Sequence, residues 1–124
     1  MALKLHVTES RTFSKTVHLE GRLDNQTVGA LDAELANIAK SAADVVVFDL
    51  AKLEYISSIG LRSIFGMHKV MAARSGKAVL VNAQPQVKKV LEIVNAVDVA
   101  AVFSSTEELD RYLDMMQRRI VEGE

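Results

Sequence analysis

The stretch VVVFDLAKLEYISSIGLRSIF, residues Val45–Phe65, carries the strongest structural signals in this chain of 124 residues. It opens with Val45–Leu50, a short apolar run rich in β-branched residues, which is typical of a central strand buried on both faces. A helical pattern begins near Ile59 and ends near Gly76. A second apolar run, Ala78–Val81, follows. The stretch therefore predicts a strand–helix–strand unit with a parallel, right-handed crossover.

Two alternating segments precede this unit. LKLHV (residues 3–7) and TVHLEGRL (residues 16–23) place an apolar side chain at about every second position, which is typical of half-buried strands. A polar connection around Ser10–Thr12 joins them. The next four residues resemble a helix start, with Asp24 or Thr27 as the N-cap, and apolar residues then follow at helical spacing.

Three further elements follow the second apolar run. They are a helix with Pro85 in its first turn, a weak strand at Val99–Phe103, and a helix that begins near Ser105. The predicted order is β-β-α-β-α-β-α-β-α. It indicates an α/β fold in a single domain, residues 1–124. We expect a mixed sheet of about five strands, with an opening antiparallel pair, a parallel core and four helices.

Composition argues against several classes of function. The net charge is −1 and no basic stripe is present, so we expect no nucleic-acid partner. The absence of cysteine excludes a disulfide framework, a thiolate metal site and a cysteine nucleophile. No segment approaches the roughly 18 apolar residues of a membrane span, and the N-terminus lacks the form of a signal peptide. We expect a soluble cytoplasmic domain that does not insert into a membrane.

Enzyme signatures are missing from the sequence, which has neither a phosphate-binding glycine motif nor a G-x-S-x-G elbow. His18 and Glu20 could contribute to a metal site, but an exposed pair on one strand is the favoured interpretation. His68 lies on the apolar face of its helix and is predicted to be partly buried and hydrogen-bonded. Asp24 and Asp49 could form an acid–base pair, although no spacing brings them together. We therefore predict no metal, no cofactor and no catalysis.

Ser57 and Ser58 stand at the junction between strand and helix. One serine suffices as an N-cap, which contributes about 1 kcal/mol. The second stands near Gly60, which costs roughly 1 kcal/mol against alanine in a helix but leaves the backbone open to close approach by another group. A phosphate here would add about −1.5 to −2 charges where the helix N-terminus tolerates an anion. The pair therefore predicts either a helix start alone or a phosphorylation switch.

In this stretch the chain resembles the STAS domain of the anti-sigma factor antagonist family. In that family a buried strand ends in Asp-Leu, a short loop carries an aromatic–Ile pair, and Asp-Ser-Ser/Thr-Gly-Leu opens a helix. The resemblance covers almost the whole chain. It includes VHLEGRLDNQTVGALDAEL (residues 17–35) and GKAVLVNAQPQVKKVLEIVNAVDVAAVFSSTEELDRYL (residues 76–113).

The resemblance implies a binding switch. In the family, an unphosphorylated antagonist binds an anti-sigma factor, often a serine kinase of the histidine-kinase-like ATPase fold, and so frees the sigma factor. The kinase phosphorylates the motif serine and releases the antagonist, and a PP2C-type phosphatase reverses the mark. The first motif serine aligns with Ser58, and Gly60 and Leu61 match directly. The usual Asp is Ser57 here and the second Ser/Thr is Ile59, so Ser57 is an alternative acceptor.

The resemblance also implies a partner-binding surface formed by this helix start and the loop after the second strand. Its residues are Asp24, Asn25, Ser57, Ser58, Ile59, Gly60 and Arg62. An exposed Ile59 would offer an apolar contact to the partner. The alternative function is a constitutive STAS scaffold subunit of a transporter or lipid-trafficking ATPase complex, with Ser58 unmodified. A small α/β nucleotide-binding protein is less favoured, because the phosphate-binding loop is missing.

Overall fold

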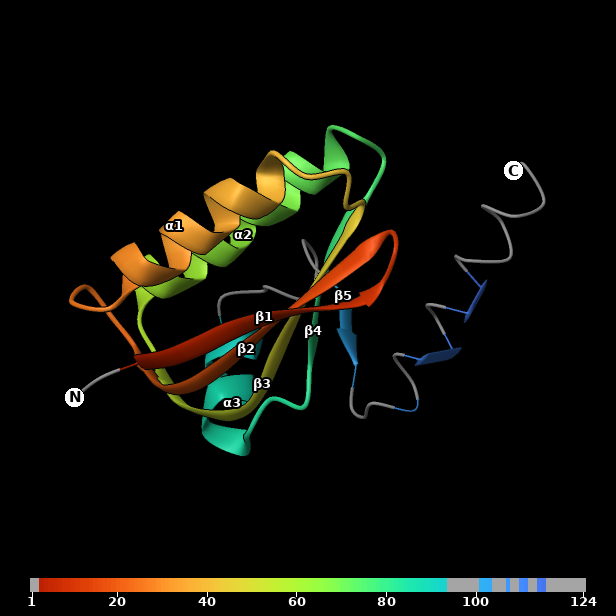
Figure 1. Ribbon diagram of the computed structural model, residues 1–124. Coiled ribbons are helices and arrows are strands. Elements are labelled where there is room, and N and C mark those ends of the chain that lie inside the picture. Colours follow the sequence, from red (N-terminus) through yellow and green to blue (C-terminus); the bar gives the residue numbers. More distant parts are fainter. Residues whose placement is uncertain (1–2, 94–100, 104–106, 108–109, 112–113, 116–124) are drawn as a thin grey trace.

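The computed structural model describes residues 3–93, 101–103, 107, 110–111 and 114–115. The elements are β1 (Leu3–Arg11), β2 (Ser14–Leu23), α1 (Val28–Ala39), β3 (Val45–Ile56), α2 (Ser58–Ala72), β4 (Lys77–Val81), α3 (Pro85–Ile93) and β5 (Ala101–Phe103). Within these residues the strands form one five-stranded sheet in the order β1-β2-β3-β4-β5 (Figure 1). The predicted α/β fold is confirmed, while most of the predicted fourth helix lies outside the described residues.

The sheet is mixed, as the sequence predicts. β1 and β2 form an antiparallel hairpin, whereas β2–β3, β3–β4 and β4–β5 are parallel pairs. Parallel neighbours need a crossover, and here each crossover contains a helix. One core cluster joins inward-facing residues of the sheet to apolar residues of α1, α2 and α3, such as Leu31, Ile64 and Leu91. Figure 1 shows α1 and α2 lying side by side above the sheet.

β3 is longer than the sequence predicts, because it continues from Leu50 to Ile56. It has 12 residues against 10 in β2, and two register shifts absorb the difference. Two pairs of consecutive residues, 51–52 and 54–55, are exposed, and each pair is followed by a single buried residue, Leu53 or Ile56. This spacing hides the usual period of two, so the predicted end of the strand was wrong.

Side chains replace β4 along the second half of β3. β4 pairs with β3 only as far as Asp49. Beyond that point, the Gln84 side-chain amide donates to the carbonyl oxygen of Ala51 at 2.8 Å, and Gln86 donates to that of Glu54 at 3.2 Å. The start of α3 therefore supports the end of β3, just before α2 begins.

Arg74 joins the ends of α1 and α2. Its Nη1 donates to the carbonyl oxygens of Ser41 and Ala43, both at 2.9 Å, and its Nη2 donates to that of Ala39 at 2.5 Å. The guanidinium therefore satisfies the carbonyl group of Ala39, in the last turn of α1, and two carbonyl groups of the connection that follows the helix. In the part of the chain that the structure describes, no helix is long and apolar enough to cross a membrane.

Candidate functional site

The start of α2 lies beside the end of β2. Leu23 and Ile56 pair at the ends of β2 and β3. The backbone N–H of Ser57 then donates to the carbonyl oxygen of Leu23 at 2.9 Å. Because Asp24 directly follows Leu23, the loop after β2 and the helix start share one edge of the sheet. The structure thus brings together the two segments that carry the predicted partner-binding residues.

The two serines at this edge have different surroundings. Ser57 is the N-cap of α2, and its hydroxyl oxygen accepts the N–H of Gly60 at 3.3 Å. Ser58 is the first residue of the helix and is exposed. Its hydroxyl makes no hydrogen bond within the described residues. Ser57 therefore caps the helix, whereas the hydroxyl of Ser58 is accessible to another molecule.

Gly60 is buried, and the close approach that it permits comes from within the chain. A Cβ at this position would lie 2.7 Å from Cγ and 2.8 Å from Cδ2 of Leu23. It would also lie 3.3 Å from Cγ1 of Ile56. Real Cβ contacts essentially never fall below 3.0 Å, so the missing side chain lets the helix start rest on the end of the β2–β3 pair. Gly60 positions the site and has no side chain to present to a partner.

Hydrogen bonds brace the loop after β2. The Asp24 carboxylate accepts the backbone N–H groups of Gln26 at 3.0 Å and Thr27 at 3.2 Å. Thr27 occupies the N-cap position of α1 but makes no side-chain cap bond to the helix. Its hydroxyl instead donates to the carbonyl oxygen of Arg22 and accepts the N–H of Asp24, both at 2.9 Å. Asn25 is left exposed at the tip of this braced loop.

Two residues that the sequence prediction missed extend this edge. The guanidinium of Arg22 lies 4.1 Å from the ring centroid of Tyr55, in cation–π geometry. Its Nε lies 3.8 Å from the carboxylate of Asp24. Tyr55 is 41% exposed, so its ring is accessible at this edge. The aromatic next to Ile56 in the motif was the available signal, but its contact with Arg22 joins two neighbouring strands that are far apart in the sequence, and it leaves no local pattern.

A groove runs along α2 away from Ser58. Its volume is about 390 Å³, and the described residues that line it are Ser58, Leu61, Arg62, Phe65, Gly66 and Lys69. Arg62 and Lys69 are exposed, whereas Leu61 is buried and Phe65 is half-buried. Ile59 is also half-buried and packs against the core. The predicted apolar contact at Ile59 is therefore only partly available to a partner.

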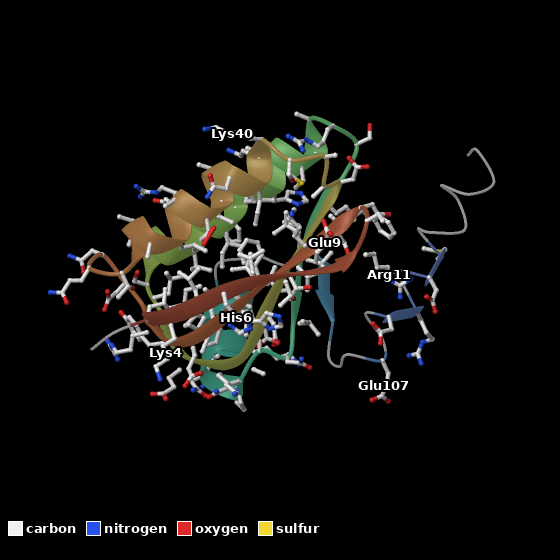
Figure 2. The ribbon with its side chains drawn as sticks, viewed as in Figure 1. Lys4, His6, Glu9, Arg11, Lys40 and Glu107 are labelled. Atoms are coloured by element: carbon white, nitrogen blue, oxygen red, sulfur yellow. The ribbon has the colours of Figure 1, made fainter. Side chains whose placement is uncertain are left out.

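A separate polar cluster lies on β1, β2 and β3. Nδ1 of His18 lies 2.9 Å from the Asp49 carboxylate, and its Nε2 lies 3.0 Å from the hydroxyl of Thr8. The ring of His6 stacks on His18 at 4.5 Å. Figure 2 shows His6 on the side of β1 away from α1 and α2. Among the described residues no group of three or more potential ligands could hold a metal, so the His18–Glu20 pair gains no third ligand.

The structure also tests the predicted Asp24–Asp49 pair and the predicted surroundings of His68. Asp24 and Asp49 are not brought together, because Asp49 pairs with His18 in the middle of the β2–β3 ladder while Asp24 follows its end. His68 is half-buried, as predicted. However, its Nδ1 is buried without a hydrogen-bond partner among the described residues, so the predicted hydrogen bonding was wrong for that atom.

Comparison with known proteins agrees with this architecture. The fold matches a structure of the anti-sigma factor antagonist SpoIIAA in its unphosphorylated form, with a TM-score of 0.78, 20% identity, and coverage of 90% of this chain and 97% of SpoIIAA. A structure of Bacillus SpoIIAA in its phosphorylated form matches with a TM-score of 0.70, at 19% identity over 88% of this chain and 99% of that one. The STAS domain of a SulP transporter from Vibrio cholerae matches with a TM-score of 0.67, at 16% identity over 90% of this chain and 88% of that one.

Sequence comparison is more specific. The STAS domain family matches residues 5–109. The chain is also 35% identical, over 89 residues, to BtrV, a proposed anti-sigma factor antagonist of Bordetella bronchiseptica. That alignment covers 72% of this chain and 77% of BtrV. The chain therefore belongs to the STAS-domain anti-sigma factor antagonist family.

Proposed function

We propose that this chain binds an anti-sigma factor when Ser58 is unmodified and releases it when Ser58 is phosphorylated. The observation that carries the proposal is the exposed Ser58 hydroxyl, which has no hydrogen-bond partner in the described part of the chain. It stands where the braced Asp24 loop and the start of α2 share one edge of the sheet. A kinase can reach this hydroxyl without opening the fold.

Ser57 is the less suitable acceptor. Its oxygen already accepts the Gly60 N–H, and the residue is half-buried. A phosphate on that oxygen would have to displace the cap, which contributes about 1 kcal/mol to a typical helix. Ser58 stands one residue further on, in the first turn, where exposed N–H groups and the helix dipole favour an anion. The folded state therefore accommodates a phosphate on Ser58 at lower cost.

The effect of the phosphate falls on the partner. An interface that buries the Ser58 hydroxyl would have to accept about −1.5 to −2 additional charges and three oxygens. A loss of roughly 3 kcal/mol of binding free energy weakens an interface by more than 100-fold. This is enough for a switch, and it needs no catalysis by this chain.

The partners in this proposal are proteins. They are an anti-sigma factor that is a serine kinase of the histidine-kinase-like ATPase fold, and a PP2C-type phosphatase that removes the phosphate. The residues that form or support the contact surface in this proposal are Asp24, Asn25, Ser57, Ser58, Ile59, Gly60 and Arg62. Among these, Asn25, Ser58 and Arg62 are exposed and can touch a partner directly. Asp24, Ser57 and Gly60 hold the loop and the helix start in place.

The second candidate is a constitutive STAS scaffold subunit, which the likeness to the SulP transporter domain supports at the level of the fold. The two functions differ in the state of Ser58. Phosphosite mapping by mass spectrometry on the chain from its native cell separates them, with Ser58→Ala and Ser57→Ala as controls. We expect phosphate on Ser58 that Ser58→Ala abolishes. Phosphate on Ser57 alone would move the acceptor, and no phosphate under any growth condition would favour the scaffold.

A further inference from the structure

The groove along α2 extends the proposed site from Ser58 toward the end of the helix. Its lining residues recur three or four positions apart from Ser58 to Lys69, so they lie on one face of the helix. At 1.5 Å per residue this face extends for about 16 Å, or three turns. Leu61 and Phe65 form its apolar part. The groove therefore begins at the hydroxyl that the switch would modify and continues well beyond it.

Gly66 keeps the middle of this groove open. The residue is exposed, and a Cβ added there would meet no atom within 4 Å. Its backbone is helical and its φ is not positive, so the conformation itself does not require glycine. Another chain can therefore approach the backbone of α2 closely at this point.

The charges along the groove have one sign. Arg62 and Lys69 are the charged side chains among its described lining residues, and both are cationic and exposed. Neither forms a salt bridge within the described part of the chain. This excess of unpaired positive charge occurs in a chain whose net charge is −1. The groove thus complements a segment that presents apolar side chains flanked by carboxylates.

We propose that this groove binds an amphipathic, acidic helix of the anti-sigma factor. The inference rests on the proposed function and adds the chemistry of the partner. A helix that lays an apolar face into a groove is a recurring mode of recognition, with anchors three or four residues apart. Here the half-buried Phe65 and the open backbone at Gly66 receive the apolar anchors above the buried Leu61, and Arg62 and Lys69 pair with the carboxylates at the rim.

The charge of the groove also explains the direction of the switch. Ser58 and Arg62 are four residues apart and are therefore neighbours on the surface of α2. A phosphate on Ser58 would compete for Arg62 with the carboxylates of the partner and would repel them. One modification thus removes an attraction and adds a repulsion at the same interface.

The test begins with two immobilised chains, the wild type and Ser58→Asp, each exposed to an extract of the native cell. The protein that binds the wild type and does not bind Ser58→Asp is the probe. After its purification, its Kd is measured for Gly66→Leu and for the matched control Gly29→Leu. Gly29 in α1 is also exposed, and a Cβ there also meets no atom within 4 Å. Both changes should raise Tm, because leucine favours a helix over glycine. Only Gly66→Leu should weaken binding, by about tenfold or more, because it fills the groove.

A second pair of variants tests the charges. Lys69→Glu should weaken binding about tenfold and reduce its salt dependence, whereas Lys4→Glu, on β1, should leave both unchanged. If Gly66→Leu and Lys69→Glu bind the probe as tightly as the wild type does, the proposal that the groove binds the partner is wrong. Loss of binding in Ser58→Asp would still support the switch at Ser58. If no protein binds the wild type in preference to Ser58→Asp, both the proposed switch and the proposed binding in the groove are wrong.

Discussion

Ser57 and Ser58 are adjacent in the chain, yet only one hydroxyl is engaged by the helix. The Ser57 oxygen accepts the N–H of Gly60, and Ser58 is exposed in the first turn. Ser57→Ala should therefore lower the free energy of unfolding by about 1 kcal/mol, as loss of an N-cap usually does. Ser58→Ala should change it by less than about 0.5 kcal/mol, as exposed substitutions usually do. Urea denaturation of the two variants beside the wild type measures both values, and equal losses would contradict the assignment of the cap.

Gly60 offers a second test at the scale of one residue. Alanine is a better helix former by about 1 kcal/mol. Its Cβ, however, would lie 2.7 Å from the side chain of Leu23, in a fully packed region. Gly60→Ala should therefore destabilise the chain by about 1–3 kcal/mol, the usual range for overpacking.

The control for this prediction is Gly66→Ala in the same helix. A Cβ at Gly66 meets nothing within 4 Å, so this change should stabilise the chain by roughly 1 kcal/mol. Thermal and urea unfolding of both variants would show opposite signs. A stabilised Gly60→Ala would mean that the start of α2 does not rest on Leu23.

At the scale of elements, α1 and α2 depend on Arg74. Its guanidinium donates to the carbonyl oxygens of Ala39, Ser41 and Ala43, which no single lysine can match in geometry. Arg74→Ala should cost about 2 kcal/mol, since hydrogen bonds from charged groups contribute about 1.5–3 kcal/mol each and part of this is recovered by water. Arg74→Lys should recover less than half of that loss.

The measurement for Arg74 is equilibrium unfolding combined with amide hydrogen exchange. Exchange should quicken first in the last turn of α1 and in the connection that follows it, where the carbonyl groups of Ala39, Ser41 and Ala43 would lose their partner. Full recovery of stability in Arg74→Lys would show that the positive charge matters and the planar geometry of the guanidinium does not. Unchanged stability in Arg74→Ala would show that water replaces the guanidinium fully.

The same scale shows where prediction from sequence succeeds. The alternating patterns around Leu5 and Val17 predict β1 and β2, because each strand buries one face only. The end of β3 escaped prediction, because two register shifts against β2 replace the period of two. The amides of Gln84 and Gln86 support that end from 33 and 32 residues away, and such contacts leave no trace in a local pattern.

At the scale of the whole molecule, the candidate site combines local and distant contributions. The helix start at Ser57 is a local signal, and the sequence predicts it. The contact of Ser57 with the end of β2 follows from the parallel pairing of β2 and β3, which brings the Asp24 loop beside α2. The Arg22–Tyr55 pair depends on that same topology, because the two residues are partners in the β2–β3 ladder, whereas the residues that line the groove all lie on α2. The extent of the single domain, residues 1–124, stays a prediction.

Phosphate on Ser58 should determine which copies of the chain are bound to the anti-sigma factor and which are free. The most direct measurement is the occupancy of phosphate on Ser58 in two pools from the same cells, the chain in complex with the anti-sigma factor and the free chain. Quantitative mass spectrometry of the peptide that contains Ser58 gives both values. We predict phosphate in the free pool and almost none in the complex. Equal occupancy in the two pools would contradict the switch.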